Sequence, residues 1–306
     1  MTRYDLAVTY DWEYDQDFVR LIESAVRARS LTVLTAPPAE AGRTLEAFRE
    51  GRIDFRVLVD RASGSSADFI ALQALAAERG RDVVEPLGRL RWASDKATMH
   101  LEFLTAGLET PHTVILPAFA ETPNVALSPA LLAPLGVPFV IKPANTTGGS
   151  VGVVADASGP ADILAARRTY PADKYLLQEK VVPETRDGRR FWFRGFYVLG
   201  EVYLTWWDDR THFYAELGPE EAAPLGLSPI FAVVRTIARV SRVRFFSTEI
   251  ARDARGRLAV IDYVNEICDM RLRSAHPDGV PDAIVARIAD RIAAYAGEAA
   301  AREISG

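Results

Sequence analysis

The sequence predicts an α/β and α+β protein, with an N-terminal parallel α/β domain followed by two further regions of mixed strands and helices. Short apolar strands alternate with amphipathic helices over residues 4–85, which is typical of a parallel sheet. Farther along, the apolar runs 245–252 and 258–264 flank an Asp-x-x-Gly turn, which predicts an antiparallel hairpin. A chain of 306 residues is long enough to give each unit its own hydrophobic core.

In the first region, the expected strands cover residues 4–9, 31–35, 55–60 and 82–85, and the expected helices cover residues 15–29, 40–50 and 66–79. Ligands of parallel sheets bind beyond the carboxyl ends of the strands. Two polar segments follow strands at such ends, residues 10–15 and residues 60–64. The acidic and aromatic segment 10–15 is therefore a candidate site for an ammonium group.

The remaining elements alternate less regularly. Ser94 is expected to cap a helix that runs to residue 106, where Gly107 ends it. The other expected strands cover residues 113–116, 139–143, 174–182 and 193–204, and the other helices cover residues 128–135, 161–168 and 229–240. Ile284, Ile288 and Ile292 recur at helical spacing, so an amphipathic helix is expected to end the chain.

Composition and charge argue against several classes of protein. The net charge of −5 argues against a surface for nucleic acid or membranes, and no apolar run is long enough to span a bilayer. The single cysteine, Cys268, rules out an internal disulfide framework. Because the first residues do not resemble a signal peptide, a cytoplasmic protein is expected. The four histidines lack metal-ligand spacing, so no zinc site is expected.

An apolar strand carries Lys142 into a segment rich in Gly, Ser and Thr, residues 145–152, and a second apolar strand leaves it. Glycines let the backbone approach an anion closely, and successive N–H groups with hydroxyls can surround phosphate oxygens. Lys142 adds a positive charge beside them. The segment does not match a P-loop, because it lacks that motif and opens no helix. The alternative is a flexible hairpin with a lysine on an edge strand.

The hairpin over residues 245–264 carries two acidic residues. A two-residue turn places Glu249 opposite Asp262, whereas a three-residue loop places Ile261 there. Two opposed carboxylates repel each other unless a cation lies between them. With the amide oxygen of Asn265 they form a set of hard oxygen ligands that suits Mg²⁺. The alternative is that the carboxylates point to solvent or pair with nearby arginines.

Two further segments have both a functional and an ordinary interpretation. Residues 179–182 offer backbone groups to an adenine edge, and Glu184 offers a carboxylate to ribose hydroxyls. The alternative is a crossover strand with surface charges. Lys96 is a second candidate for phosphate binding, or it begins an exposed helix.

In chain order, these segments resemble the ATP-grasp superfamily. The matching pieces are Asp95-Lys96, the strand that carries Lys142, the loop over residues 146–153, the hinge strand over residues 178–184, and Glu249, Asp262 and Asn265. The resemblance covers roughly residues 90–272. It implies a preATP-grasp α/β domain at residues 1–88, a small subdomain at residues 89–180 and a C-terminal subdomain at residues 181–306, with ATP between the two subdomains.

The resemblance also assigns a role to each matching position. The residues implied to contact the phosphates of ATP are Lys96, Lys142, Thr147, Gly148, Gly149, Ser150 and Gly152, those implied to contact adenine are Glu179, Lys180 and Val182, and Glu184 is implied to hold ribose. Glu249, Asp262 and Asn265 are implied to bind one or two Mg²⁺ ions. The family usually ends in carboxylate-x-Asn, whereas two residues separate Asp262 from Asn265 here. Asn265 therefore needs a bulge, or lies past the strand end, and Asp262 is the safer ligand.

Arg194 and Arg271 are the candidates for catalytic contact with substrate, because an arginine beside the metal segment can neutralise a carboxylate or a developing acylphosphate. For Arg271 the alternative is a salt bridge with Asp269 or Asp278. The loop that begins with two tryptophans, residues 206–212, either lines a pocket or anchors a subdomain contact.

The resemblance implies an ADP-forming ligase. A substrate carboxylate attacks the γ-phosphoryl group of ATP, and an amine then displaces phosphate from the acylphosphate. The implied partners are a small carboxylate and an amine, for which an amino acid or peptide is suitable, and a homodimer is a possible assembly. The alternatives are a kinase that phosphorylates a hydroxyl group, and a nucleotide-binding module without catalysis.

Overall fold

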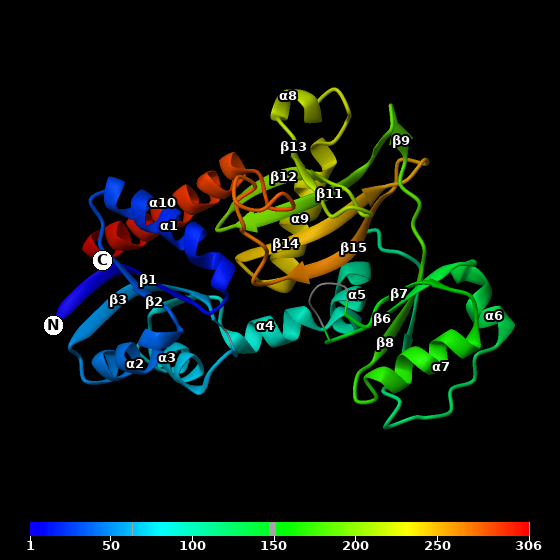
Figure 1. Ribbon diagram of the computed structural model, residues 1–306, viewed down its shortest axis with the longest axis horizontal. Helices are drawn as coiled ribbons and strands as arrows, with labels where there is room; N and C mark the ends of the chain where they lie inside the picture. Colours follow the sequence, from blue (N-terminus) through cyan, green and yellow to red (C-terminus); the bar gives the residue numbers. More distant parts are fainter. Residues whose placement is uncertain (63, 147–150, 306) are drawn as a thin grey trace.

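The structure, a computed structural model, describes residues 1–62, 64–146 and 151–305 (Figure 1). The N-terminal domain is a parallel sheet of order β2-β1-β3-β4, as predicted. Its strands are β1 (Thr2–Tyr10), β2 (Val33–Ala36), β3 (Ile53–Arg61) and β4 (Asp82–Val84), and its helices are α1 (Gln16–Ala28), α2 (Ala41–Arg49) and α3 (Ala67–Glu78). Helix α1 packs in one hydrophobic core and α2 with α3 in another, so both faces of the sheet are covered.

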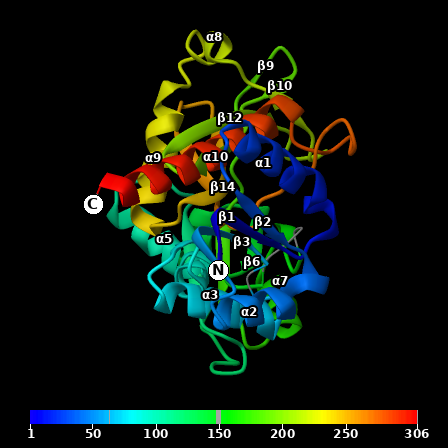
Figure 2. The ribbon, with the colours of Figure 1, turned by 90° about the vertical axis from the view of Figure 1, so that its left-hand side faces the viewer.

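The last helix, α10 (Asp282–Ser305), belongs spatially to the N-terminal domain. Its residues Ile284, Ile288 and Ile292 share a core with β1 and α1, so the amphipathic face expected from their spacing is buried there (Figure 2). The chain therefore returns to its first domain, and both ends of the sequence stabilise the same sheet.

The second part is a four-stranded antiparallel sheet of order β5-β8-β6-β7. Its elements are α4 (Leu87–Ser94), α5 (Lys96–Thr105), β5 (Thr113–Leu116), α6 (Pro129–Leu132), β6 (Phe139–Pro143), β7 (Val154–Ala157), α7 (Pro160–Thr169) and β8 (Tyr175–Glu179). The expected cap was wrong by one residue: Ser94 ends α4, and Asp95 caps α5 by accepting a hydrogen bond from the backbone N–H of Thr98.

The third part is a five-stranded antiparallel sheet of order β13-β12-β11-β14-β15. Its elements are β11 (Trp192–Val198), β12 (Glu201–Trp207), β13 (Tyr214–Glu216), α9 (Ser228–Ser241), β14 (Phe245–Arg252) and β15 (Leu258–Asn265), preceded by the small hairpin β9 (Thr185–Arg186) and β10 (Arg189–Arg190), with α8 (Pro219–Ala222) between β13 and α9. The single strand expected over residues 193–204 was wrong. The chain reverses at Leu199 and Gly200, which both have positive φ, and an unbroken apolar pattern conceals this two-residue turn.

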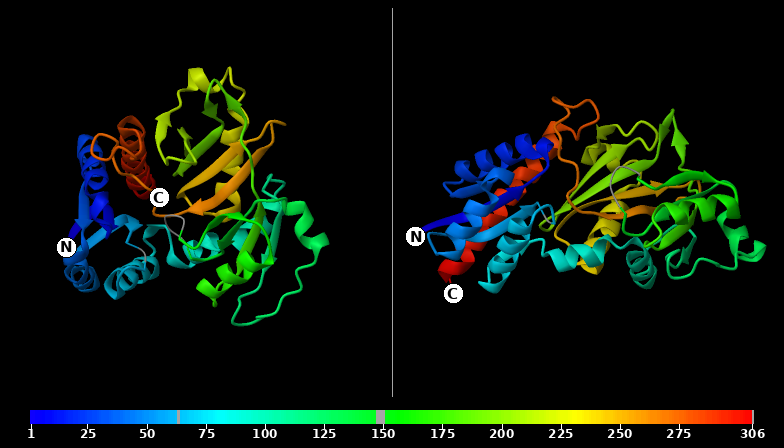
Figure 3. Two further views of the ribbon diagram at one scale, coloured as in Figure 1. Left: turned by 45° about the vertical axis from the view of Figure 1, so that its right-hand side comes forward. Right: turned by 60° about the horizontal axis from the view of Figure 1, so that its bottom comes forward.

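The five-stranded sheet lies between α10 on one side and the β5–β8 sheet on the other (Figure 3). Within the described ranges, none of the helices combines the length and apolar character needed to cross a membrane.

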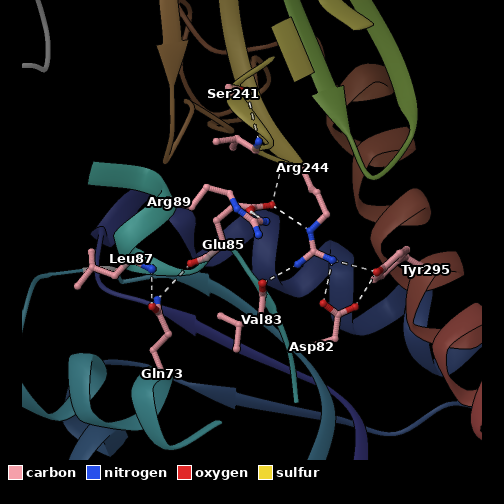
Figure 4. A network of polar contacts seen from close by, with 10 residues as sticks. Gln73, Asp82, Val83, Glu85, Leu87, Arg89, Ser241, Arg244 and Tyr295 are labelled. Atoms are coloured by element: carbon pink, nitrogen blue, oxygen red, sulfur yellow. Dashed lines mark hydrogen bonds and ion pairs between the residues drawn. The ribbon is translucent and has the colours of Figure 1, made fainter. Parts of the chain in front are cut away.

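Arg244, at the start of β14, joins the third part to the N-terminal domain and α10 (Figure 4). Its backbone N–H donates to Glu85 at 2.6 Å, and its guanidinium donates to Asp82 at 2.8 Å and to the carbonyl oxygen of Val83 at 2.5 Å. The Tyr295 hydroxyl donates to the same Asp82 carboxylate at 2.6 Å. That hydroxyl also accepts a hydrogen bond from Arg244 at 3.1 Å, so one arginine bonds to acceptors from β4, the following loop and α10 together.

The substitution Arg244→Met is expected to lower the free energy of unfolding by roughly 2–3 kcal/mol, because the buried Glu85 and the half-buried Asp82 lose a charged donor. Denaturant unfolding measures this loss. The matched control is Arg242→Met, which changes an exposed arginine two residues away. Equal destabilisation by both variants would contradict the linking role of Arg244.

Candidate active site

A cavity of about 570 Å³ lies where β6, β14 and β15 approach one another. Six of the sequence-predicted residues line it, and they come from five elements: Lys96, Lys142, Arg194, Glu249, Asp262 and Asn265. The fold thus gathers residues that lie up to 169 positions apart in the sequence.

Two irregularities in the hairpin set the position of its acidic residues. Close to the turn, Ile250 pairs with Val260, which is the register of an odd-numbered loop. A shift between Glu249 and Ile250 then inserts one extra residue in β15, so that Asp262 lies opposite Glu249. The predicted pairing is confirmed, but a bulge produces it rather than a two-residue turn. A second shift places Asn265 opposite Ser247, at the same end of the strand.

The two carboxylates have different cationic neighbours. Glu249 lies opposite Arg194 in the sheet and accepts a hydrogen bond from its guanidinium, and it also accepts one from the Trp192 indole at 3.2 Å. Asp262 Oδ1 lies 3.8 Å from Lys96 Nζ. Burial raises the pKa of the Glu249 carboxyl and outweighs Arg194. For Asp262 burial acts in the same direction, but the nearby cations outweigh it and lower the pKa.

Lys142 is buried at the base of the cavity. Its Nζ donates a hydrogen bond to the carbonyl oxygen of Ile261 at 2.7 Å and lies 5.5 Å from the ring centroid of Tyr263. Burial lowers its pKa to about 8, which Asp262 opposes and Lys96 reinforces. Lys142 therefore links β6 to the bulge of β15, because Ile261 is the extra residue there.

The residues present fit a magnesium ion. Asp262 Oδ1 is shielded from solvent and has no hydrogen-bond partner in the described part of the chain. A carboxylate oxygen in that condition is costly unless a cation binds it. Among the described residues no three His, Cys, Asp or Glu side chains form a metal cluster. The candidate donors in the cavity are therefore the two carboxylates together with the Asn265 amide oxygen. Hard oxygens of this kind suit Mg²⁺.

The glycine-rich segment is described only at its ends. Thr147, Gly148, Gly149 and Ser150 lie outside the described residues. Gly152 has φ of +73°, and a Cβ there would lie 2.7 Å from the Tyr170 ring. Both its backbone conformation and its surroundings therefore require glycine.

The hinge residues make ion pairs of their own. Glu179 accepts a hydrogen bond from Arg257 at 2.7 Å, and Glu184 accepts one from Arg252 at 2.9 Å. Lys180 pairs with an aspartate of β7, and Val182 is exposed. Their adenine and ribose roles stay predictions. No motif indicated the apolar side chains of Val140, Val153 and Ile261, which also line the cavity.

Arg271 adopts the alternative arrangement considered for it. Its guanidinium pairs with Asp269 at 2.8 Å and with Asp278 at 2.9 Å, and only Asp269 of these three is among the cavity's lining residues. Arg194 is thus the arginine that the structure places in the cavity, and a catalytic role for Arg271 stays a prediction.

The pocket interpretation of the tryptophan loop applies to Trp207, whereas Trp206 packs within the third part of the molecule rather than between subdomains. Trp206 is buried against Phe193, whereas Trp207 lines the cavity and stacks on His212 with ring centroids 5.5 Å apart. Neighbouring residues of a strand point to opposite faces, which explains the division. From the N-terminal segment, Trp12 reaches the cavity, and Tyr214 is a lining residue that the sequence did not reveal.

A scan of protein-family models and a search of curated proteins found no match to this sequence. Solved structures match it over nearly the whole chain. A RimK-domain ATP-grasp protein from Sphaerobacter thermophilus is 21% identical, with a TM-score of 0.62 over 95% of this chain and 98% of its own. D-alanine–D-alanine ligase from Bacillus anthracis, complexed with ATP, is 13% identical, with a TM-score of 0.63 over 97% of this chain and 98% of its own.

A third match is the ATP-grasp ligase PsnB, complexed with a minimal precursor, Mg and ADP, which is 14% identical with a TM-score of 0.60 over 96% of this chain and 98% of its own. The protein therefore has the ATP-grasp fold. This confirms the predicted architecture of a parallel α/β domain followed by two α+β subdomains.

The pKa of Lys142 generates a prediction about pH. Below about pH 8 Lys142 is already protonated before the nucleotide binds. Above that pH, binding of one nucleotide must be accompanied by uptake of one proton on Lys142. Affinity for Mg·ATP is expected to stay constant up to that pH and then fall by up to about tenfold per pH unit. Calorimetric titration between pH 7 and 9.5 measures this. The guanidinium of Lys142→Arg does not titrate there, so a fall of equal steepness in that variant would exclude Lys142 as its cause.

Asp262→Asn is expected to raise the Mg²⁺ concentration needed for half-maximal ATP binding by about 10- to 100-fold, because the amide lacks the negative charge that attracts the ion. The measurement is a Mg²⁺ titration of nucleotide binding. Asp290→Asn, on the exposed face of α10, is the control. Unchanged Mg²⁺ dependence in Asp262→Asn would exclude it as a ligand.

Proposed function

We propose that this protein is an ATP- and Mg²⁺-dependent ligase that forms ADP and joins a carboxylate to an amine through an acylphosphate. The observation that carries the proposal is the cavity in which Lys96, Lys142 and Arg194 surround the opposed carboxylates Glu249 and Asp262. Binding a nucleotide without turnover has less need for such a pair, which is costly to keep side by side. The ATP-grasp fold of known ligases supports the same conclusion.

The reaction requires positioning and charge neutralisation rather than a protein nucleophile. A substrate carboxylate, already ionised at neutral pH, attacks the γ-phosphorus of ATP, and the bond to the ADP oxygen breaks. Lys96 and Lys142 stabilise the charge on the phosphate oxygens, and Arg194 stabilises the carboxylate as it becomes acylphosphate. Mg²⁺, held by Glu249, Asp262 and Asn265, would supply further neutralisation of phosphate charge. The amine then attacks the acyl carbon, phosphate leaves with the bonding electrons, and the proton of the amine passes to the departing phosphate.

The aromatic residues in the lining of the cavity suit an organic substrate. Trp12, Trp207 and Tyr214 line it, and they give an apolar surface beside the charged groups. The structural neighbours include a D-alanine–D-alanine ligase and a ligase complexed with a precursor peptide. We therefore propose an amino acid or peptide as the amine, acting in the cytoplasm, and keep a homodimer as a possible assembly.

The test is ADP formation from Mg·ATP with pooled amino acids, dipeptides and small carboxylates. Turnover is expected to need both a carboxylate and an amine, and to fall by about 100-fold or more in Lys142→Ala. Arg239→Ala, an exposed cation on α9, is expected to behave as wild type. ADP release that depends on a hydroxyl compound without any amine would instead identify a kinase, and ATP binding without turnover in any pool would favour a binding module.

A further inference from the structure

The turn between α7 and β8 contacts one end of the glycine-rich segment through Asp173. This carboxylate is buried, with 7% of the residue exposed. It accepts hydrogen bonds from the backbone N–H of Asn145 at 2.9 Å, from the backbone N–H of Thr146 at 2.7 Å and from the Asn145 amide at 3.0 Å. Within the described part of the chain, these N–H groups are the hydrogen-bond donors to its oxygens.

The same turn contacts the other end of that segment. The Tyr170 ring fills the space beside Gly152, where a Cβ would lie 2.7 Å from it. Only two residues separate Tyr170 from Asp173, so one short turn contacts both ends of the glycine-rich segment.

The turn also contacts the element that carries Lys96. Lys174 Nζ donates to the Asp95 carboxylate at 2.5 Å, and its carbonyl oxygen accepts from the backbone N–H of Ala144 at 2.8 Å. The backbone N–H of Lys96 in turn donates to the carbonyl oxygen of Ala144 at 3.0 Å. The α7–β8 turn is thus bonded to the cap of α5 and to the chain that continues from Lys142.

We propose that Asp173 is a positioning residue for nucleotide binding. It fixes the backbone at Asn145 and Thr146, directly after the strand that carries Lys142, and thereby sets where the phosphates meet the protein. This inference rests on the proposed function only in that the cavity binds ATP. A buried carboxylate held by N–H groups of a neighbouring segment restrains that segment strongly, because each such bond is charge-assisted. Asp173 itself lies outside the cavity's lining among the described residues, so it acts through Asn145 and Thr146.

The test measures binding of a non-hydrolysable ATP analogue with Mg²⁺ by calorimetry, together with the thermal unfolding midpoint. Asp173→Ala is expected to weaken binding by about 10- to 100-fold, since a small misplacement of a binding group is costly. Asp173→Asn keeps one oxygen for the backbone N–H groups but loses the negative charge and the acceptor for the Asn145 amide, so it is expected to weaken binding by an intermediate factor of about 3- to 10-fold. The control is Asp162→Ala: Asp162 also accepts a backbone N–H, from Ser158 at 2.7 Å, but at the opposite end of α7.

Affinity of Asp173→Ala within about twofold of wild type would overturn the proposal, as would an equal loss in Asp162→Ala. Should Asp173→Ala not fold, Asp173→Asn decides: weaker binding at an unchanged unfolding midpoint supports the role, and wild-type affinity overturns it. The assay is independent of ligation. A wild-type protein that binds the analogue but joins no carboxylate to an amine contradicts the ligase alone, whereas an active ligase whose binding ignores Asp173 contradicts the positioning role alone.

Discussion

The opposition of Glu249 and Asp262 on adjacent strands is the constraint on which the rest of the site depends. Two partly buried carboxylates on directly opposed residues repel each other, which is unfavourable without nearby cations. The chain supplies three, and each comes from a different element: Arg194 from β11, Lys96 from the first turn of α5 and Lys142 from β6. Balancing one pair of charges therefore requires the second and third parts of the molecule to meet at this hairpin.

Hydrogen bonds between uncharged groups hold the same hairpin on the face of β15 opposite the cavity. The Tyr263 hydroxyl, on the residue after Asp262, lies 2.7 Å from His100 Nδ1 on α5 and accepts from Gln178 on β8 at 2.8 Å. Burial and the neighbouring Lys142 lower the pKa of His100 to about 4, so this imidazole is neutral at physiological pH. The face of β15 turned away from the cavity thus holds α5 and β8 without adding charge, which leaves the cationic side chains to the cavity.

The sequence predicted what depends on periodicity and motif order, and missed what depends on local backbone chemistry. Alternating strands and helices predicted the N-terminal sheet, and the order of Lys142, Glu249 and Asp262 predicted the fold. The two shifts in β15 were not predictable in position, because a bulge leaves the apolar pattern nearly unchanged. The cavity lining was predicted in part: segment 10–15, which supplies Trp12, was expected to lie near a ligand, whereas Tyr214 reaches the site from an element whose position only tertiary packing decides.

The charge balance of the cavity is consistent with the proposed binding of both a metal ion and a polyanion at one site. Three cations line the cavity against the two carboxylates Glu249 and Asp262, which leaves one positive charge in excess. Asp269 also lines the cavity, but its charge is balanced by Arg271, which lies outside the lining. This excess attracts phosphate. Burial, reinforced by the neighbouring Lys96, lowers the pKa of Lys142 below that of an ordinary lysine. A triphosphate carries more negative charge than this excess can neutralise, so a divalent cation at the two carboxylates completes the balance. In the proposed function, metal and nucleotide would therefore favour each other's binding, because each supplies the charge that the other leaves unbalanced.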